Sequence, residues 1–136
     1  MRSNVRIRHL VKLIGVAVFS TVLALFFLFV GFMKAFAPLT ELARHRAWTV
    51  HLPVLVGRGV GWTEIICALL LLFGMFCPSI GIAGALALLL NQVGAGVVHA
   101  WVGEFQSLPQ NGLIVFICGV VCYLQFRRID RGSVAS

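Results

Sequence analysis

The sequence predicts an all-α integral membrane protein, a four-helix bundle with a short interfacial helix between its first and second spans. Two observations support this fold class. Hydrophobic residues make up 60% of the 136 residues and charged residues only 11%, whereas soluble domains carry about 25% charged residues. Charge-free stretches also cover residues 13–33, 65–103 and 105–126, and a helix needs roughly 20 apolar residues to cross a bilayer. The middle stretch is long enough for two crossings.

Prolines and charged residues set the expected ends of the four spans, which together form a single domain of residues 1–136. Pro38 should end the first span, and Pro109 suits the first turn of the last one. The expected ranges are 10–36, 58–76, 79–101 and 109–126. The connection over residues 39–57 mixes charged and aromatic side chains, which is typical of an amphipathic helix lying in the interface, with a turn at Pro53.

The basic N-terminus followed by an apolar run resembles a secretory signal, and Ala35-Phe36-Ala37 resembles a cleavage site. However, the apolar run from Leu13 to Met33 exceeds the roughly 7–15 residues of a signal core. Lys34 also lies just before the apparent cleavage site. We therefore expect the first span to remain part of the protein.

The formal net charge of +7 would suit a nucleic-acid partner, but the basic residues lie at the ends of apolar runs. That placement predicts contact with a lipid bilayer and no nucleic-acid partner. Seven basic residues lie on the side of the termini, against four on the side of the connection between the first two spans, which predicts that both termini are cytoplasmic (Arg2, Arg6, Arg8, Lys12, Arg127, Arg128 and Arg131). Trp48, Trp62 and Trp101 then all fall near the outer interface.

Two charges within the spans need a partner, because a charge in a membrane helix costs about 2.5–3.5 kcal/mol on insertion scales. Lys34 lies near the outer end of the first span, and Glu64 lies roughly 9 Å below the outer end of the second. Gly57, Gly61 and Ala68 share one helix face with Glu64 and allow close helix approach. We therefore expect Glu64 to point into the bundle and to pair with Lys34, although Lys34 could instead extend to the interface.

Three further polar residues are candidates for the same region. Asn91 and His99 lie on one face of the third span, and Asn111 begins a stripe on the fourth. Each of the four helices then has one of these polar residues in the outer half of the bilayer: Lys34, Glu64, His99 or Asn111. This pattern predicts either a polar pocket opening outward or a hydrogen-bond network that fixes the helix register.

Metal and thiol chemistry have little support in the sequence. The residues His45, His51, His99 and Glu104 lack the spacing of a known ligand motif, so no metal site is predicted. The four cysteines form no CxxC pair, and we expect them to pack as small apolar residues (Cys67, Cys77, Cys118 and Cys122).

Four segments resemble the DoxX-like family in order and spacing. They are Gly31-x-x-Lys34, Gly61-x-x-Glu64, Ala95-Gly96-Val97-Val98-His99 and Pro109-Gln110-Asn111. The resemblance covers residues 16–128. It implies a four-helix protein of a bacterial inner membrane, with Lys34, Glu64, His99 and Asn111 at the matching positions. Founding members of the family are described as small subunits of a thiosulfate:quinone oxidoreductase. Some related proteins act in redox-stress complexes, and distant animal relatives act as receptor-assembly chaperones.

Three functions therefore stay open. The first is an accessory subunit of a quinone-linked redox system, with a partner protein carrying most of the catalysis and quinone as the implied cofactor. The second is a membrane chaperone or assembly factor without chemistry. The third is a small transporter that works as a homo-oligomer, which is less favoured because alternating access usually uses inverted repeats and none is evident here.

Overall fold

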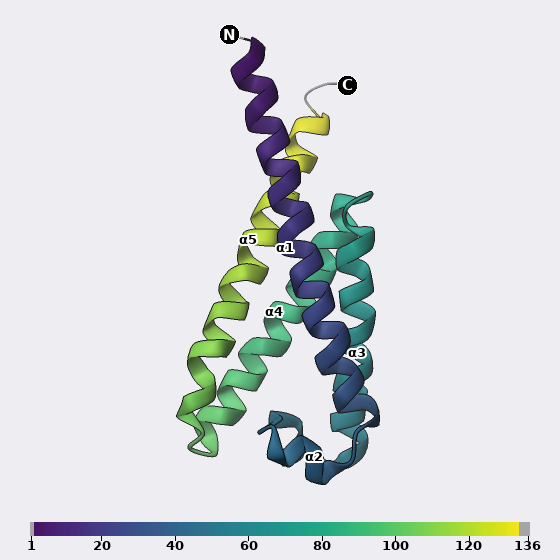
Figure 1. Ribbon diagram of the computed structural model, residues 1–136, viewed down its shortest axis with the longest axis vertical. Coiled ribbons are helices and arrows are strands. Elements are labelled where there is room, and N and C mark those ends of the chain that lie inside the picture. The colour runs from purple at the N-terminus through teal and green to yellow at the C-terminus, as the bar shows by residue number, and fades with distance from the viewer. Residues whose placement is uncertain (1, 134–136) are drawn as a thin grey trace.

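The computed structural model describes residues 2–133, all helices and their connections, and Figure 1 shows their arrangement. Four helices are long and apolar enough to cross a membrane, as predicted. The elements are α1 (Arg2–Phe36), α2 (Leu39–Arg44), η1 (Trp48–His51), α3 (Val54–Phe73), α4 (Pro78–Trp101), η2 (Phe105–Ser107) and α5 (Leu108–Ser133).

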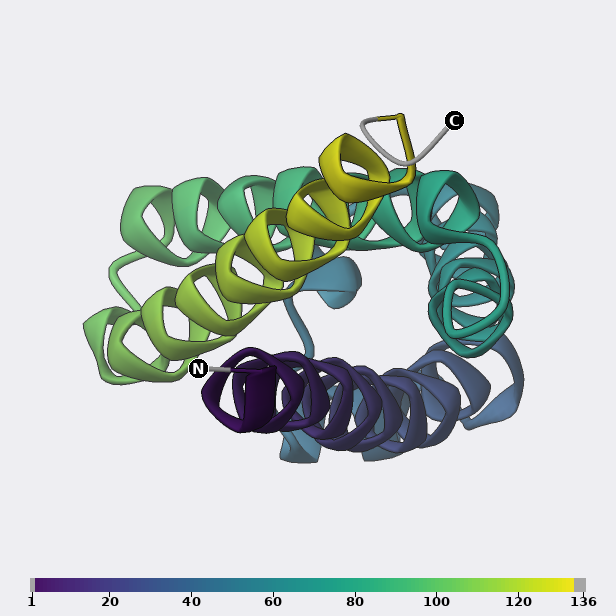
Figure 2. The same ribbon diagram turned by 90° about the horizontal axis from the view of Figure 1, so that it is seen from above.

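The long helices pack as two close pairs, α1 with α3 and α4 with α5, and α3 joins the pairs by packing on α4. Figure 2 shows this order from above, with the segment that contains α2 and η1 beneath the long helices. The start of α1 and the end of α5 lie at one end of the bundle, and α2 with η1 lies at the other, which we call the α2 end (Figure 1). In the half away from the α2 end, α1 approaches α5, where a Cβ on Gly15 would lie 3.7 Å from Cδ1 of Leu124. Towards the α2 end, α1 and α5 diverge (Figure 1).

The helix ends differ from the sequence-based ranges at several places, and α1 begins at Arg2 rather than at residue 10. α3 begins at Val54, directly after its N-cap Pro53, rather than at residue 58, and it ends at Phe73 rather than 76. α5 continues through the arginines after residue 126, because Arg is a good helix former beyond the apolar run. The interfacial helix is broken into α2 and η1, because Arg46 adopts φ 51°, a left-handed conformation that ends a helix.

Two glycines let α1 and α3 touch through their backbones. A Cβ on Gly61 would lie 2.6 Å from the backbone nitrogen of Ala35 and 2.7 Å from the carbonyl oxygen of Gly31. A Cβ on Gly31 would lie 2.8 Å from the carbonyl oxygen of Gly61 and 3.1 Å from Cβ of Glu64. Small residues at such a crossing bring the helix axes close together. Since Lys34 and Glu64 each follow one of these glycines by three residues, the crossing also brings their side chains together.

At the end of the bundle opposite α2, α5 covers the turn between α3 and α4. The carbonyl oxygen of Gly74 accepts hydrogen bonds from Nε2 of Gln125 and from Nη1 of Arg128, each at 3.1 Å. Arg128 also donates to Oε1 of Gln125 at 2.8 Å and to the carbonyl oxygen of Met75 at 2.9 Å. The last carbonyls of a helix have no partner inside it, so these side chains satisfy groups that the helix leaves unpaired.

Candidate functional site

A buried ion pair joins α1 to α3. Nζ of Lys34 lies 2.5 Å from Oε1 of Glu64, and both side chains are almost completely buried. The same oxygen accepts a hydrogen bond of 2.6 Å from Nδ2 of Asn91 on α4, so three helices meet at one carboxylate. The second oxygen, Oε2, is buried and has no hydrogen-bond partner in the part of the chain that the structure describes. This arrangement pairs Lys34 with Glu64, as the sequence predicted, and adds Asn91 to the pair.

Lys34 is held by two further contacts. Its carbonyl oxygen would normally accept from the backbone N–H four residues later, but that residue is Pro38, which has none. Nη1 of Arg58 on α3 donates to this oxygen at 2.9 Å and satisfies it. The Nζ atom also lies 5.5 Å from the centroid of the Trp48 ring, within the range of a cation–π contact. The end of α1 is therefore fixed by α3 on one side and by η1 on the other.

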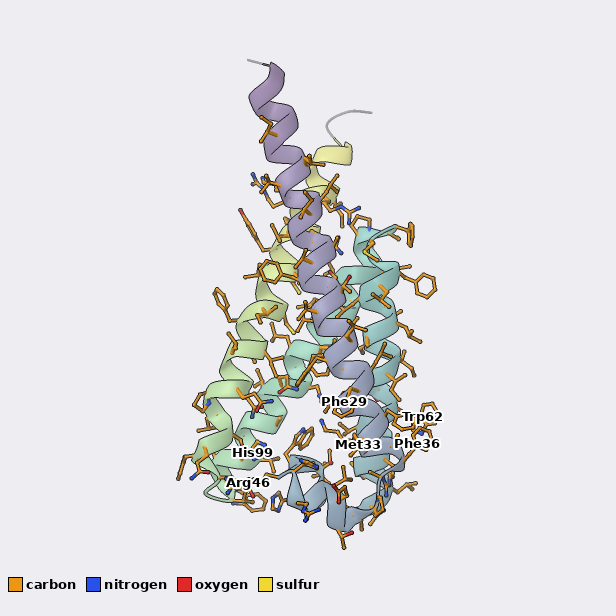
Figure 3. All side chains as sticks on the ribbon, viewed as in Figure 1. Phe29, Met33, Phe36, Arg46, Trp62 and His99 are labelled. Atoms are coloured by element: carbon orange, nitrogen blue, oxygen red, sulfur yellow. The ribbon has the colours of Figure 1, made fainter. Side chains whose placement is uncertain are left out.

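A cavity of about 240 Å³ lies where α1 and α5 diverge. We call it the α1–α5 cavity. One part of its wall is apolar, and Figure 3 shows Phe29 and Met33 on the α1 side and His99 on the α4 side. The polar part comes from α1, the α2–η1 connection, α4 and the start of α5. The polar lining residues are Lys34, His45, Arg46, Trp48, Gln92, His99, Ser107, Gln110 and Asn111.

The α2–η1 connection is tied across the bundle to the loop between α4 and α5. Nη1 of Arg46 donates to Oε1 of Gln106 at 2.5 Å, and Figure 3 shows Arg46 reaching towards that loop. In the same loop, Oε2 of Glu104 lies 2.7 Å from Nδ1 of His99 on α4, and Oε1 lies 3.7 Å from Nε2 of His51 on η1. These contacts join α4 and the loop after it to η1 and to the α2–η1 connection at the α2 end of the bundle.

Two lining residues carry buried N–H groups that no protein atom satisfies. They are Nε1 of Trp48 and Nδ2 of Asn111, both without a hydrogen-bond partner among the described residues. A buried donor without a partner costs free energy, on the order of 1–3 kcal/mol. Such groups often mark a place where a ligand or an ordered water binds.

The structure separates the sequence-predicted residues into two groups. Lys34, His99 and Asn111 line the α1–α5 cavity, whereas Glu64 and Asn91 do not and contact Lys34 or each other instead. The lining residue on α4 next to Asn91 is Gln92, whose side chain is buried.

Sequence reasoning did not single out three of the residues at this site. It placed Trp48 only at the interface, and it did not single out Arg46, which lies in the α2–η1 connection, or Gln106, which lies in η2. The sequence feature that could have identified Arg46 as a site residue is its position in a basic connection between two spans.

The histidines do not gather into a metal site. No group of three or more His, Cys, Asp or Glu side chains in residues 2–133 is placed to hold a metal ion. His45 contacts Glu41 on its own helix, whereas His51 and His99 both contact Glu104.

The cysteines are free thiols in differing environments. Cys67 and Cys118 are buried in the core and Cys122 is partly buried, as expected for small apolar residues. Cys77 is exposed, contrary to that expectation, because it forms the N-cap of α4 in the turn after α3.

The chain matches one known protein family. The model of the DoxX-like family matches residues 18–121, which is most of the chain and includes residues of all four spans. No curated protein and no solved structure matches the sequence.

Proposed function

The chain belongs to the DoxX-like family of membrane proteins, and from this starting point we propose that it is an accessory subunit of a quinone-linked redox system. In this proposal the α1–α5 cavity holds the ring of a membrane-soluble quinone. The protein that carries the catalysis is a partner, and the chain supplies the binding site. The location is the inner membrane of a bacterium, with both termini in the cytoplasm.

One observation carries the proposal: the cavity is amphipathic and is lined by residues of three of the helices that are long and apolar enough to cross a membrane. Ligand sites are mostly apolar with a few placed polar groups, which describes this lining. A quinone has an apolar ring with carbonyl oxygens that accept hydrogen bonds. The N–H groups of Trp48 and Asn111, both on lining residues, lack acceptors among the described residues. In this proposal a molecule that dissolves in the bilayer enters between α1 and α5, where the two helices diverge (Figure 1).

The ion pair behind the cavity supports a binding site of fixed shape. Glu64 and Asn91 hold Lys34 at the wall, and the Gly31–Gly61 contact fixes the two helices that carry the pair. A ligand would therefore meet a preorganised ammonium group rather than a flexible one.

The test uses a matched pair of substitutions on one helix. Val30 lines the cavity, whereas Val22 is 56% exposed on the outside of α1 and is not a lining residue. The protein is purified in mild detergent and titrated with a quinone bearing a decyl tail, and binding is followed by the quenching of tryptophan fluorescence. We expect saturable binding to the wild type and to Val22→Phe, and a loss of at least tenfold in affinity for Val30→Phe.

Other outcomes would favour the other functions. If Val22→Phe and Val30→Phe lose affinity equally, binding is to the surface and the cavity is not the site. If no quinone binds and a membrane protein client co-purifies reproducibly, the assembly-factor function gains support. Flux of a solute into liposomes that contain the chain alone would favour a homo-oligomeric transporter.

A further inference from the structure

His99 and Glu104 form a pair that the proposed function does not yet use. His99 lies near the end of α4, is 4% exposed and lines the α1–α5 cavity. Nδ1 of its ring lies 2.7 Å from Oε2 of Glu104, which lies in the loop just after α4. The backbone fixes this contact, because the N–H of Glu104 donates to the carbonyl oxygen of His99 at 2.8 Å.

The pair determines which ring nitrogen can accept a hydrogen bond. A carboxylate can only accept, so Nδ1 carries the proton in this contact. In the neutral ring, Nε2 then has a free lone pair and is an acceptor. Nε2 has no hydrogen-bond partner among the described residues. His99 therefore presents an oriented acceptor at a cavity whose other polar groups are mostly donors or amides.

The other ionisable groups near this pair are accounted for. His51 on η1 contacts the second oxygen of Glu104 at 3.7 Å and so shares the carboxylate rather than competing for Nε2. Lys34 is paired with Glu64, and His45 contacts Glu41. Arg46 donates to Gln106. None of these contacts uses the free nitrogen of His99.

We propose that His99, oriented by Glu104, accepts a hydrogen bond from a ligand hydroxyl, so that the cavity prefers the hydroquinone form of a quinone. This inference rests on the proposed function and deepens it, because it names the redox form that the site selects. A quinone carbonyl cannot donate to Nε2, whereas the hydroxyl of a hydroquinone can. His99 is then a specificity-determining residue, and Glu104 is a positioning residue that acts through it.

The test compares the affinities of two ligands, of which only one has hydroxyl groups that can donate a hydrogen bond. The probes are a hydroquinone with a decyl tail and its dimethyl ether, which keeps the ring and the tail but has no hydroxyl donor. Dissociation constants are measured in mild detergent without oxygen. We expect the wild type to bind the hydroquinone about three- to tenfold more tightly than the ether, the range that one hydrogen bond supplies.

Two variants and one control test whether the preference for the hydroquinone depends on His99 and Glu104. In His99→Phe the ratio of the two dissociation constants should fall to about one, with the affinity for the ether little changed. In Glu104→Gln the side-chain amide can donate to Nδ1, which permits the other tautomer, so the ratio should fall between those of the wild type and His99→Phe. Val22→Phe is the matched control, because Val22 lies on the outside of α1 and does not line the cavity, and its ratio should equal that of the wild type.

The outcomes separate this inference from the function on which it rests. If neither the hydroquinone nor the parent quinone binds the wild type, the proposed function fails and this inference fails with it. If both bind and the ratio is the same in the wild type, His99→Phe and Glu104→Gln, the cavity remains a quinone site but His99 does not select the hydroxyl. Should His99→Phe fail to fold, His99→Gln and Glu104→Gln decide the question. His99→Gln keeps an acceptor oxygen and should retain most of the preference, whereas Glu104→Gln should lose part of it.

Discussion

The buried pair of Lys34 and Glu64 predicts a strongly non-additive response to substitution. In Lys34→Met, the carboxylate of Glu64 stays buried with Asn91 as its remaining hydrogen-bond donor. In Glu64→Gln, the ammonium of Lys34 stays buried without a counter-ion. Breaking a buried pair by removing one partner costs about 3–5 kcal/mol, so we expect each single variant to lose that much stability.

The double variant should recover most of this loss. Replacing both charges leaves no unpaired ion. Replacing a buried ion pair by uncharged residues often changes the stability little. The amide oxygen introduced by Glu64→Gln would still accept a hydrogen bond from Asn91. We therefore expect the free energy of unfolding of Lys34→Met/Glu64→Gln to lie within about 2 kcal/mol of the wild type. The coupling energy from the double-mutant cycle should then be several kcal/mol.

The assay is unfolding in mild detergent titrated with a denaturing detergent and followed by helical circular dichroism. The exposed pair of Glu41 and Arg44, 3.9 Å apart on α2, is the control. Its cycle, with Glu41→Gln and Arg44→Met, should give a coupling of about 0–1 kcal/mol. Two results would contradict the account of the pair. One is that the stability losses of Lys34→Met and Glu64→Gln simply add in the double variant. The other is that each of these variants loses less stability than Glu41→Gln or Arg44→Met.

Three further predictions concern backbone contacts and backbone conformation, all measured by the same unfolding assay. Gly61→Ala should lower the free energy of unfolding by several kcal/mol, because the new Cβ would meet the backbone of α1. Its control, Gly59→Ala, should be neutral or slightly stabilising, since nothing lies within 4 Å of the new Cβ. Equal effects of the two variants would contradict the close crossing of α1 and α3. Arg58→Met should cost about 1–3 kcal/mol by leaving the carbonyl oxygen of Lys34 without a donor, and no loss would mean that water replaces the guanidinium. Gly103→Ala should cost about 1 kcal/mol, because φ is +81° there although the space is open, and a stabilising effect would contradict that backbone conformation.

Much of the fold could be predicted because the physical requirement is simple. Stretches without charge must be helical in a bilayer, and Pro38, Pro53 and Pro78 mark where helices end or begin. The pairing of Lys34 with Glu64 was also predictable, because both charges lie at similar depth on helices joined by a short connection.

The remaining features depend on how the helices are arranged, which the helical pattern does not contain. Gln125 covers the turn after α3 because α5 packs across it, and no spacing within α5 indicates that contact. Arg46 breaks the interfacial helix through a left-handed backbone conformation that its residue type does not favour. The α1–α5 cavity exists because two helices far apart in sequence diverge, and this divergence is a property of packing rather than of either helix.

The measurement that tests the central claim most directly is photolabelling in native membranes. An azido-quinone with a decyl tail is irradiated with membranes that contain the protein, and the labelled peptides are identified by mass spectrometry. The proposed function predicts labels on the lining residues of α1 and α5 around Val30 and Ile114, and their loss when excess unlabelled quinone is present. Labels spread evenly over the lipid-facing surfaces of α3 and α4, without competition, would contradict a quinone site in the α1–α5 cavity.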